Sequence, residues 1–94
     1  MKFKTTQINK MKNILAHYGA ENQKFKTIEA LQELREAIVE EHLNIGTRDH
    51  IIEEVSDVYV MLEQLRYIYH ISDEEILDIV DFKLDRQLKR IKNE

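Results

Sequence analysis

The sequence predicts an all-α protein, a bundle-like fold of four helices in a single domain that spans residues 1–94. Proline is absent and glycine occurs only twice, at Gly19 and Gly46, so long helices can run without interruption. Apolar residues recur at helical spacing in four segments, and no segment alternates with the period of two that marks a strand. Of the 94 residues, 43% are hydrophobic and 34% are charged, which is typical of one small globular domain.

The first helix is expected over about residues 5–18 and the second over about residues 27–42. Gly19 can adopt the left-handed backbone conformation that ends a helix, so it is expected to end the first helix. Asn44 and Gly46 are expected to end the second. The apolar stripe of the first helix consists of Ile8, Met11, Leu15 and Tyr18. The stripe of the second helix consists of Ile28, Leu31, Leu34 and Ile38.

Capping signals place the other two helices. Thr47 can cap a third helix that runs to about His70. Ser72, with Glu75 three residues later, forms a capping-box pattern that begins a fourth helix. The expected core stripe of the third helix is Ile51, Val55, Val58, Leu62, Leu65 and Tyr69, and Gln64 falls on the opposite, solvated side together with Glu53 and Val60. The stripe of the fourth helix is Leu77, Val80, Leu84, Leu88 and Ile91.

Several large apolar side chains fall outside these stripes, namely Val60, Tyr67, Ile79 and Phe82. A bundle of four such helices has little interior, so the extra apolar residues predict a second contact surface, most simply between two copies. We therefore expect a homodimer or a dimer of dimers. The alternative is that these residues are scattered on the surface, where single apolar side chains are common.

Composition and charge exclude several classes of function. Cysteine is absent, so a metal must be held by oxygen or histidine ligands, which favours magnesium, manganese or calcium. The net charge of -4 argues against a nucleic-acid partner. No apolar run approaches the ~20 residues of a membrane span, and the lysine-rich N-terminus lacks the apolar core of a signal peptide. A cytoplasmic protein without a membrane partner is expected.

Acidic residues occur beside the apolar stripes of the second and third helices. Glu54 lies on the shoulder of its stripe, with Asp57 beside it one turn on, and like charges at this spacing repel. Glu33 is the carboxylate nearest to the flank of the second stripe, where Ala30 lies. Two antiparallel helices can direct Glu33, Glu54 and Asp57 into one gap, an arrangement that suits Mg²⁺. The alternative is that they are solvated, as acidic residues on helices usually are.

Two stretches carry a resemblance to a known family: HYGAENQKFKTIEALQELREAI, residues 17–38, and HIIEEVSDVYVMLEQL, residues 50–65. They resemble the MazG-like nucleotide pyrophosphohydrolases, an all-α family with the pattern E-E-x-x-E on one helix and E-x-x-D on the next. The second pattern is intact as Glu54-Val55-Ser56-Asp57, and the first reads Glu29-Ala30-Leu31-Gln32-Glu33. The resemblance covers nearly the whole chain. It implies Mg²⁺-dependent hydrolysis of a nucleoside triphosphate to a monophosphate and pyrophosphate, with Mn²⁺ as a possible substitute metal.

The resemblance also assigns roles to individual residues. It implies that Glu33, Glu54 and Asp57 are metal ligands. It gives Glu29 and Glu33 catalytic roles, Glu29 acting through a water. The remaining ligand position is Ala30, whose methyl group cannot coordinate a metal. The resemblance therefore predicts an enzyme whose activity is weakened or lost because of Ala30.

Three explanations of Ala30 remain open at this point. The chain is an engineered inactive variant, a natural member that has lost catalysis, or one that recruits Glu29 or Glu36 instead. The alternative function is a non-catalytic helical dimer that keeps the fold and binds a nucleotide or a protein.

Basic residues on the fourth helix are candidates for binding the substrate's phosphates. Lys83 and Arg90 lie beside its apolar stripe, within roughly 20° of each other. Lys83 also belongs to the segment FKLDRQ, which is similar to the family. For Arg90 the alternative is simpler, because basic residues near a helix C-terminus interact favourably with the helix dipole.

Overall fold

A computed structural model describes residues 2–94 and contains four helices: α1 (Thr5–Tyr18), α2 (Ala20–His42), α3 (Arg48–Tyr69) and α4 (Asp73–Lys92). No strand occurs in residues 2–94, so the predicted all-α class is confirmed. Within the same residues, no helix combines the length and the apolar character needed to cross a membrane.

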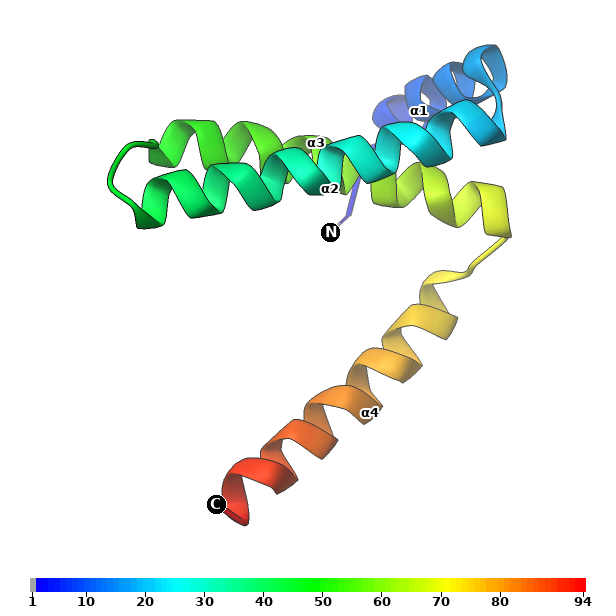
Figure 1. The fold of residues 1–94 in the computed structure, drawn as a ribbon. Helices are drawn as coiled ribbons and strands as arrows, with labels where there is room; N and C mark the ends of the chain where they lie inside the picture. Colours follow the sequence, from blue (N-terminus) through cyan, green and yellow to red (C-terminus); the bar gives the residue numbers. More distant parts are fainter. Residues whose placement is uncertain (1) are drawn as a thin grey trace.

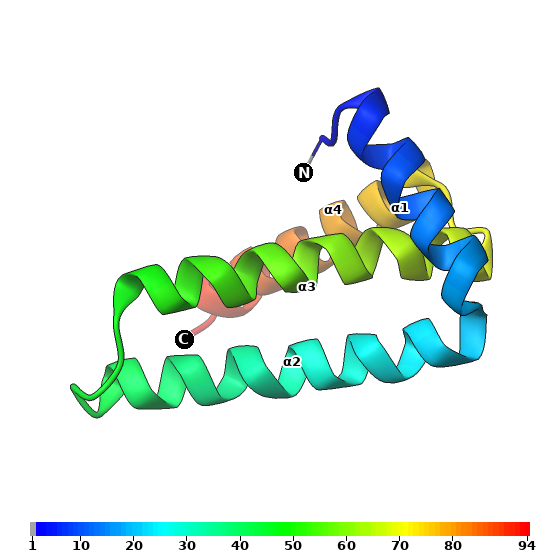
Figure 2. The same ribbon diagram turned by 90° about the horizontal axis from the view of Figure 1, so that it is seen from above.

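The helices form a three-helix unit with a projecting fourth helix. α2 and α3 run side by side as an antiparallel hairpin, and α1 packs against both (Figures 1 and 2). α4 leaves the end of α3 and packs against none of the other described helices (Figure 1). The Cα radius of gyration is 16.1 Å, compared with about 12 Å for a compact domain of this length. One chain alone therefore does not form the predicted four-helix bundle.

The boundary between α1 and α2 differs from the expectation. Gly19 has a φ of +87°, which favours glycine, and its N–H donates to the carbonyl of Leu15. α2 begins directly after it at Ala20, not at Thr27 as predicted. The reason is that residues 20–26 contain no helix breaker, so the helix extends beyond its apolar stripe as far as Gly19.

The other predicted caps are confirmed. Asn44, with a φ of +62°, follows the end of α2. The Thr47 hydroxyl accepts a hydrogen bond from the N–H of His50 at the start of α3. Ser72 and Glu75 form the reciprocal capping box that begins α4.

The buried face of α2 is not the predicted apolar stripe, and the buried face of α3 shares only Val58 with its predicted stripe. α2 buries small and polar residues instead, namely Gln23, Thr27, Ala30 and Ala37. Small side chains at Ala30 and Ala37 let the two helix backbones approach closely, which larger residues would prevent. On α3 the buried face includes Glu54, Val58 and Gln64, and Gln64 is only 1% exposed. The prediction that Gln64 is solvated is therefore wrong.

Large apolar residues of both helices are left on one side of the hairpin. We call this the apolar side; it comprises Ile28, Leu31, Ile38, Ile52, Tyr59 and Leu62, which are between 40% and 51% exposed. Each of them lies about 140–160° around its helix from Glu33 on α2 or Asp57 on α3. The apolar side and the acidic residues therefore occupy opposite sides of the hairpin.

Candidate metal centre

Three carboxylates from two helices meet on the hairpin, on the side opposite its apolar side. Glu33 comes from α2, whereas Glu54 and Asp57 lie one turn apart on α3. One carboxylate oxygen from each of the three lies within 4.8 Å of the others. The structure therefore brings together the three residues that the sequence suggested as metal ligands.

Glu54 differs from the other two carboxylates because it is buried. The residue is 8% exposed, and its Oε2 is buried without a hydrogen-bond partner. Burial raises the pKa of its carboxyl above the ordinary value, Glu33 and Asp57 raise that pKa further, and His50 lowers it. His50 Nε2 is 3.9 Å from Glu54 Oε1, too far for a good hydrogen bond. The negatively charged form of Glu54 is therefore unfavourable at this position unless it is paired or coordinated.

The donor set fits a hard divalent cation. All three side chains offer carboxylate oxygens, the ligands that Mg²⁺ prefers, and Glu54 supplies an oxygen that has no other partner. A cation would also remove the repulsion between the three carboxylates. Glu33 and Asp57 are exposed, which leaves the centre open to water.

A pocket of about 450 Å³ lies beside the three carboxylates, between α1, α2 and α3. Glu33 and Asp57 belong to its lining, and Ile14, Val60 and Met61 give it apolar walls. This volume is within the range of small-molecule sites. The acidic cluster therefore has room beside it for a ligand of nucleotide size.

A buried amide pair lies in the same pocket, and sequence reasoning missed it. Gln23 Nε2 donates to Gln64 Oε1 at 2.8 Å, and both residues line the pocket. A signal for Gln64 was present in the sequence: it follows Glu54 by ten residues and Asp57 by seven, spacings that place all three on one helix face.

Ala30 lies on the pocket wall one turn before Glu33, and it is 6% exposed. Glu29 also lines the pocket, but its carboxylate pairs with Lys26 Nζ at 3.4 Å and is not part of the three-carboxylate group. Glu36 belongs neither to the pocket lining nor to that group. Of Glu29 and Glu36, Glu29 therefore lies nearer to the position of the missing ligand.

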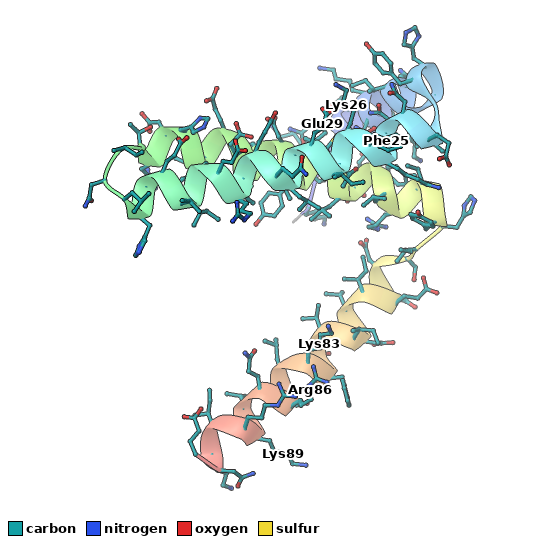
Figure 3. All side chains as sticks on the ribbon, in the orientation of Figure 1. Phe25, Lys26, Glu29, Lys83, Arg86 and Lys89 are labelled. Carbon is teal, nitrogen blue, oxygen red and sulfur yellow. The ribbon has the colours of Figure 1, made fainter. Side chains whose placement is uncertain are left out.

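The predicted phosphate contacts are not brought to this pocket within one chain. Lys83 and Arg90 lie on α4, whereas Lys26 and Glu29 lie on α2 and line the pocket. Figure 3 shows Lys83 on a different helix from Lys26 and Glu29. Among the described residues, Lys26 is the one cationic side chain in the pocket lining, and the sequence analysis did not select it. The substrate-binding role of Lys83 and Arg90 stays a prediction.

Comparisons of the chain with protein-family models, with curated proteins and with solved structures found no match. The functional interpretation therefore depends on the geometry of this site and on the resemblance of its two acidic motifs.

Proposed function

We propose that the chain is a magnesium-dependent nucleoside triphosphate pyrophosphohydrolase, weakened or inactive as written, that releases pyrophosphate and a nucleoside monophosphate. The observation that supports it is the convergence of Glu33, Glu54 and Asp57 on one point. The buried and unpartnered oxygen of Glu54 adds to it, because a coordinated cation gives that oxygen a partner.

In this proposal each residue has a physical task. Glu33, Glu54 and Asp57 hold Mg²⁺, with Mn²⁺ as a possible substitute. A cation bound there shields the phosphate charge and lowers the pKa of the attacking water. Glu29, on the pocket wall, accepts the proton of that water, and Lys26 beside it attracts the phosphates. The apolar walls hold the nucleoside.

A second candidate is a non-catalytic dimer that binds a nucleotide or a protein. Ala30 favours it, because a methyl group occupies the position at which the resemblance requires a fourth oxygen ligand. Both candidates use the same pocket, so pyrophosphate release across a panel of NTPs and dNTPs with Mg²⁺ distinguishes them.

We also propose that two copies associate as a homodimer, alone or within a dimer of dimers. Only four apolar residues of the described chain are buried, namely Met11, Ala30, Ala37 and Val58. The large apolar residues on the apolar side of the hairpin remain about half exposed, and contact with a second copy would cover them. A closed two-fold arrangement, which buries the same surface on both copies, is the simplest solution.

Mg²⁺ is expected to raise the melting temperature of the chain through the three carboxylates. A ligand that binds only the folded state at a hundred times its Kd adds about 2.7 kcal/mol, which corresponds to roughly 10 °C or more in a domain of this size. Differential scanning fluorimetry with and without Mg²⁺ measures the shift, and Asp57→Asn should reduce it strongly. An equal shift in Asp57→Asn would show that Mg²⁺ binds elsewhere.

Replacing Leu31 with aspartate is expected to weaken the dimer by about tenfold or more, because it places a charge on an apolar contact surface. Sedimentation equilibrium gives the mass directly: the unmodified chain should approach twice 11.3 kDa. Gln32→Asp adds the same charge at the next, exposed residue and should leave the dimer intact. A monomeric unmodified chain would contradict the proposed dimer.

A further inference from the structure

Two buried glutamines join α2 to α3 at the pocket and leave one polar atom of each amide free. Gln23 Nε2 donates to Gln64 Oε1 at 2.8 Å, and the two residues are only 4% and 1% exposed. Within residues 2–94, Gln23 Oε1 and Gln64 Nε2 make no hydrogen bond, yet neither atom is completely shielded from solvent. The open space that both residues border is the pocket beside the carboxylates. One free acceptor and one free donor therefore reach the pocket side by side.

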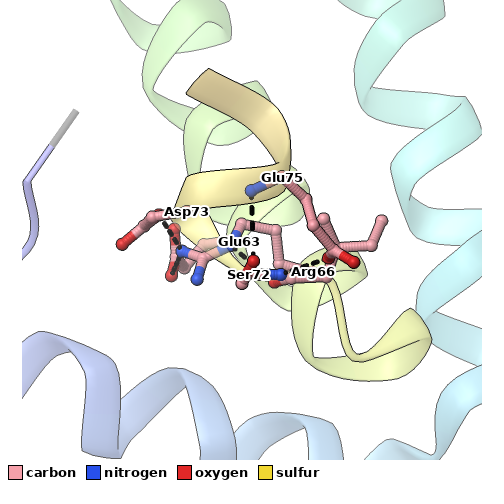
Figure 4. Close-up of polar contacts among 6 residues, drawn as sticks. Glu63, Arg66, Ser72, Asp73 and Glu75 are labelled. Carbon is pink, nitrogen blue, oxygen red and sulfur yellow. Dashed lines mark hydrogen bonds and ion pairs between the residues drawn. The ribbon is translucent and has the colours of Figure 1, made fainter. Parts of the chain in front are cut away.

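The neighbouring buried polar side chains are, by contrast, used within the fold. The hydroxyl of Thr27 donates to the carbonyl of Gln23 at 2.8 Å, one turn earlier in α2. Glu63 is buried too, and its Oε1 lies 2.6 Å from Nη1 of Arg66, which also lies 2.9 Å from Asp73 Oδ1 at the joint with α4 (Figure 4). These contacts hold one helix turn or one joint together. The glutamine pair joins two helices and, in addition, keeps a donor and an acceptor available to a ligand in the pocket.

The two free amide atoms match the hydrogen-bonding edge of a nucleobase. If both amides turn over together, their mutual hydrogen bond is kept and one donor and one acceptor again face the pocket. The Watson–Crick edge of each common nucleobase presents an acceptor next to a donor, so it can pair with both free atoms. Ile14, Tyr18 and Met61 line the same pocket and offer apolar surface to the faces of a base.

The glutamine pair lies at a suitable distance from the three carboxylates. Gln64 follows Asp57 by seven residues and Glu54 by ten, and Gln23 precedes Glu33 by ten. Because an α-helix rises about 1.5 Å per residue, the pair lies roughly 10–15 Å from the carboxylates along the hairpin. This separation is comparable to the distance between the Watson–Crick edge of a base and the phosphates of the same nucleotide.

We propose that Gln23 and Gln64 together recognise the base of the bound nucleotide. The nucleotide lies along the hairpin, with its base at the two amides and its phosphates at the carboxylates. This inference rests on the nucleotide substrate proposed above and specifies which residues distinguish a nucleotide from other triphosphates. The pair is then a specificity determinant, because a ligand without a base leaves both amide atoms to water.

Nucleotide binding in the presence of Mg²⁺ tests this assignment without requiring catalysis. The ligands are the α,β-methylene analogues of ATP, GTP, CTP and UTP, whose α–β bridge cannot be cleaved, and the same ribose triphosphate analogue without a base. Isothermal titration calorimetry gives each Kd. The variant is Gln23→Met/Gln64→Met, which keeps side chains of similar length and removes both amides, so that neither is left without its buried partner. Gln32→Met, at an exposed residue of α2 outside the pocket lining, is the matched control.

The unmodified chain is expected to bind at least one nucleotide analogue about tenfold or more tighter than the base-free analogue, since two hydrogen bonds depend on the base. The double variant should lose most of this preference and keep its affinity for the base-free analogue, and Gln32→Met should change neither. An unchanged preference in a folded double variant would mean that the amides only join the helices, and that outcome overturns the proposal.

A second measurement needs no substitution in the pair. In ¹⁵N–¹H spectra of the unmodified chain, the side-chain amide signals of Gln23 and Gln64 should shift with a nucleotide analogue and much less with the base-free analogue. Equal shifts with both ligands overturn the proposal. Binding of the base-free analogue without any preference for a base also overturns it but leaves the metal centre in place. Base-dependent binding without pyrophosphate release by Ala30→Glu overturns the proposed hydrolysis and supports base recognition by the pair.

Discussion

Replacing Ala30 with glutamate is expected to raise magnesium-dependent pyrophosphate release by about tenfold or more, because even outer partners of a metal site change its performance by about 10–100-fold. Ala30 lines the pocket one turn before Glu33, so a carboxylate there enters the same space as the existing three. The substitution also adds a negative charge to an already repulsive group. The metal-free variant should therefore be less stable than the unmodified chain, and its stabilisation by Mg²⁺ should be larger.

Ala30→Gln is the matched control for this experiment. Glutamine has nearly the size and shape of glutamate but brings no negative charge, so it should show neither the gain in pyrophosphate release nor the larger stabilisation by Mg²⁺. The result that excludes hydrolysis is a folded Ala30→Glu chain that is stabilised by Mg²⁺ yet releases no more pyrophosphate than Ala30→Gln with any NTP or dNTP. In that case the pocket binds a nucleotide without cleaving it, and the second candidate function takes its place.

Local signals in the sequence predicted the helices well and their packing poorly. Gly19, Thr47 and Ser72 act within one turn of the chain, so the end of α1 and the starts of α3 and α4 could be predicted, whereas the start of α2 was not. Which face of a helix is buried depends on what lies opposite, and that partner is distant in the sequence. The rule that the most apolar face is buried failed for α2, which buries Ala30 and Ala37 and leaves Leu31 about half exposed.

The predicted packing of the four helices was wrong for a physical reason, and the same reason is relevant to assembly. A bundle-like fold of four amphipathic helices was expected, with a second copy covering the apolar residues outside its stripes. The chain instead buries its small and polar residues internally and keeps Leu31, Leu62 and the stripe of α4 exposed. Such an arrangement leaves a large apolar surface uncovered in one chain, which is consistent with the homodimer that the sequence predicted from the apolar residues outside the stripes.

The candidate site was predicted where it depends on spacing within a helix. The separation of Glu54 and Asp57 by three residues is enough to place them together, and Glu33 follows once α2 and α3 are antiparallel neighbours. Gln64 was missed because it lies opposite the apolar stripe of α3 on the helical wheel, which predicted that it is solvated. Its place on the same helix face as Asp57 was the signal that predicts its burial. The burial of Glu54 and the isolation of its Oε2 depend on α2 and were visible only in the structure.

Replacing Glu54 with glutamine is expected to change two properties in opposite directions. The metal-free variant should melt at a higher temperature than the unmodified chain, because a buried charge is replaced by a neutral group of the same shape. Stabilisation by Mg²⁺ should be lost, and in the Ala30→Glu background pyrophosphate release should fall by about a hundredfold, a typical loss for one electrostatic stabiliser. Glu53→Gln is the matched control: its side chain is 78% exposed, and it should change neither property.

The pH dependence separates a buried charge from a simple packing effect. Because the pKa of Glu54 is raised in the folded state, the folded chain binds a proton more tightly than the unfolded chain. Its stability therefore falls as the pH rises from the ordinary glutamate value through the raised pKa. The difference in melting temperature between Glu54→Gln and the unmodified chain should be near zero at the acidic end of this window and grow toward neutral pH. Stabilisation by Mg²⁺ should grow over the same window, since binding requires the deprotonated carboxylate. A difference that stays constant with pH would mean that Glu54 carries no energetic penalty when charged, and the argument that a cation compensates it would no longer hold.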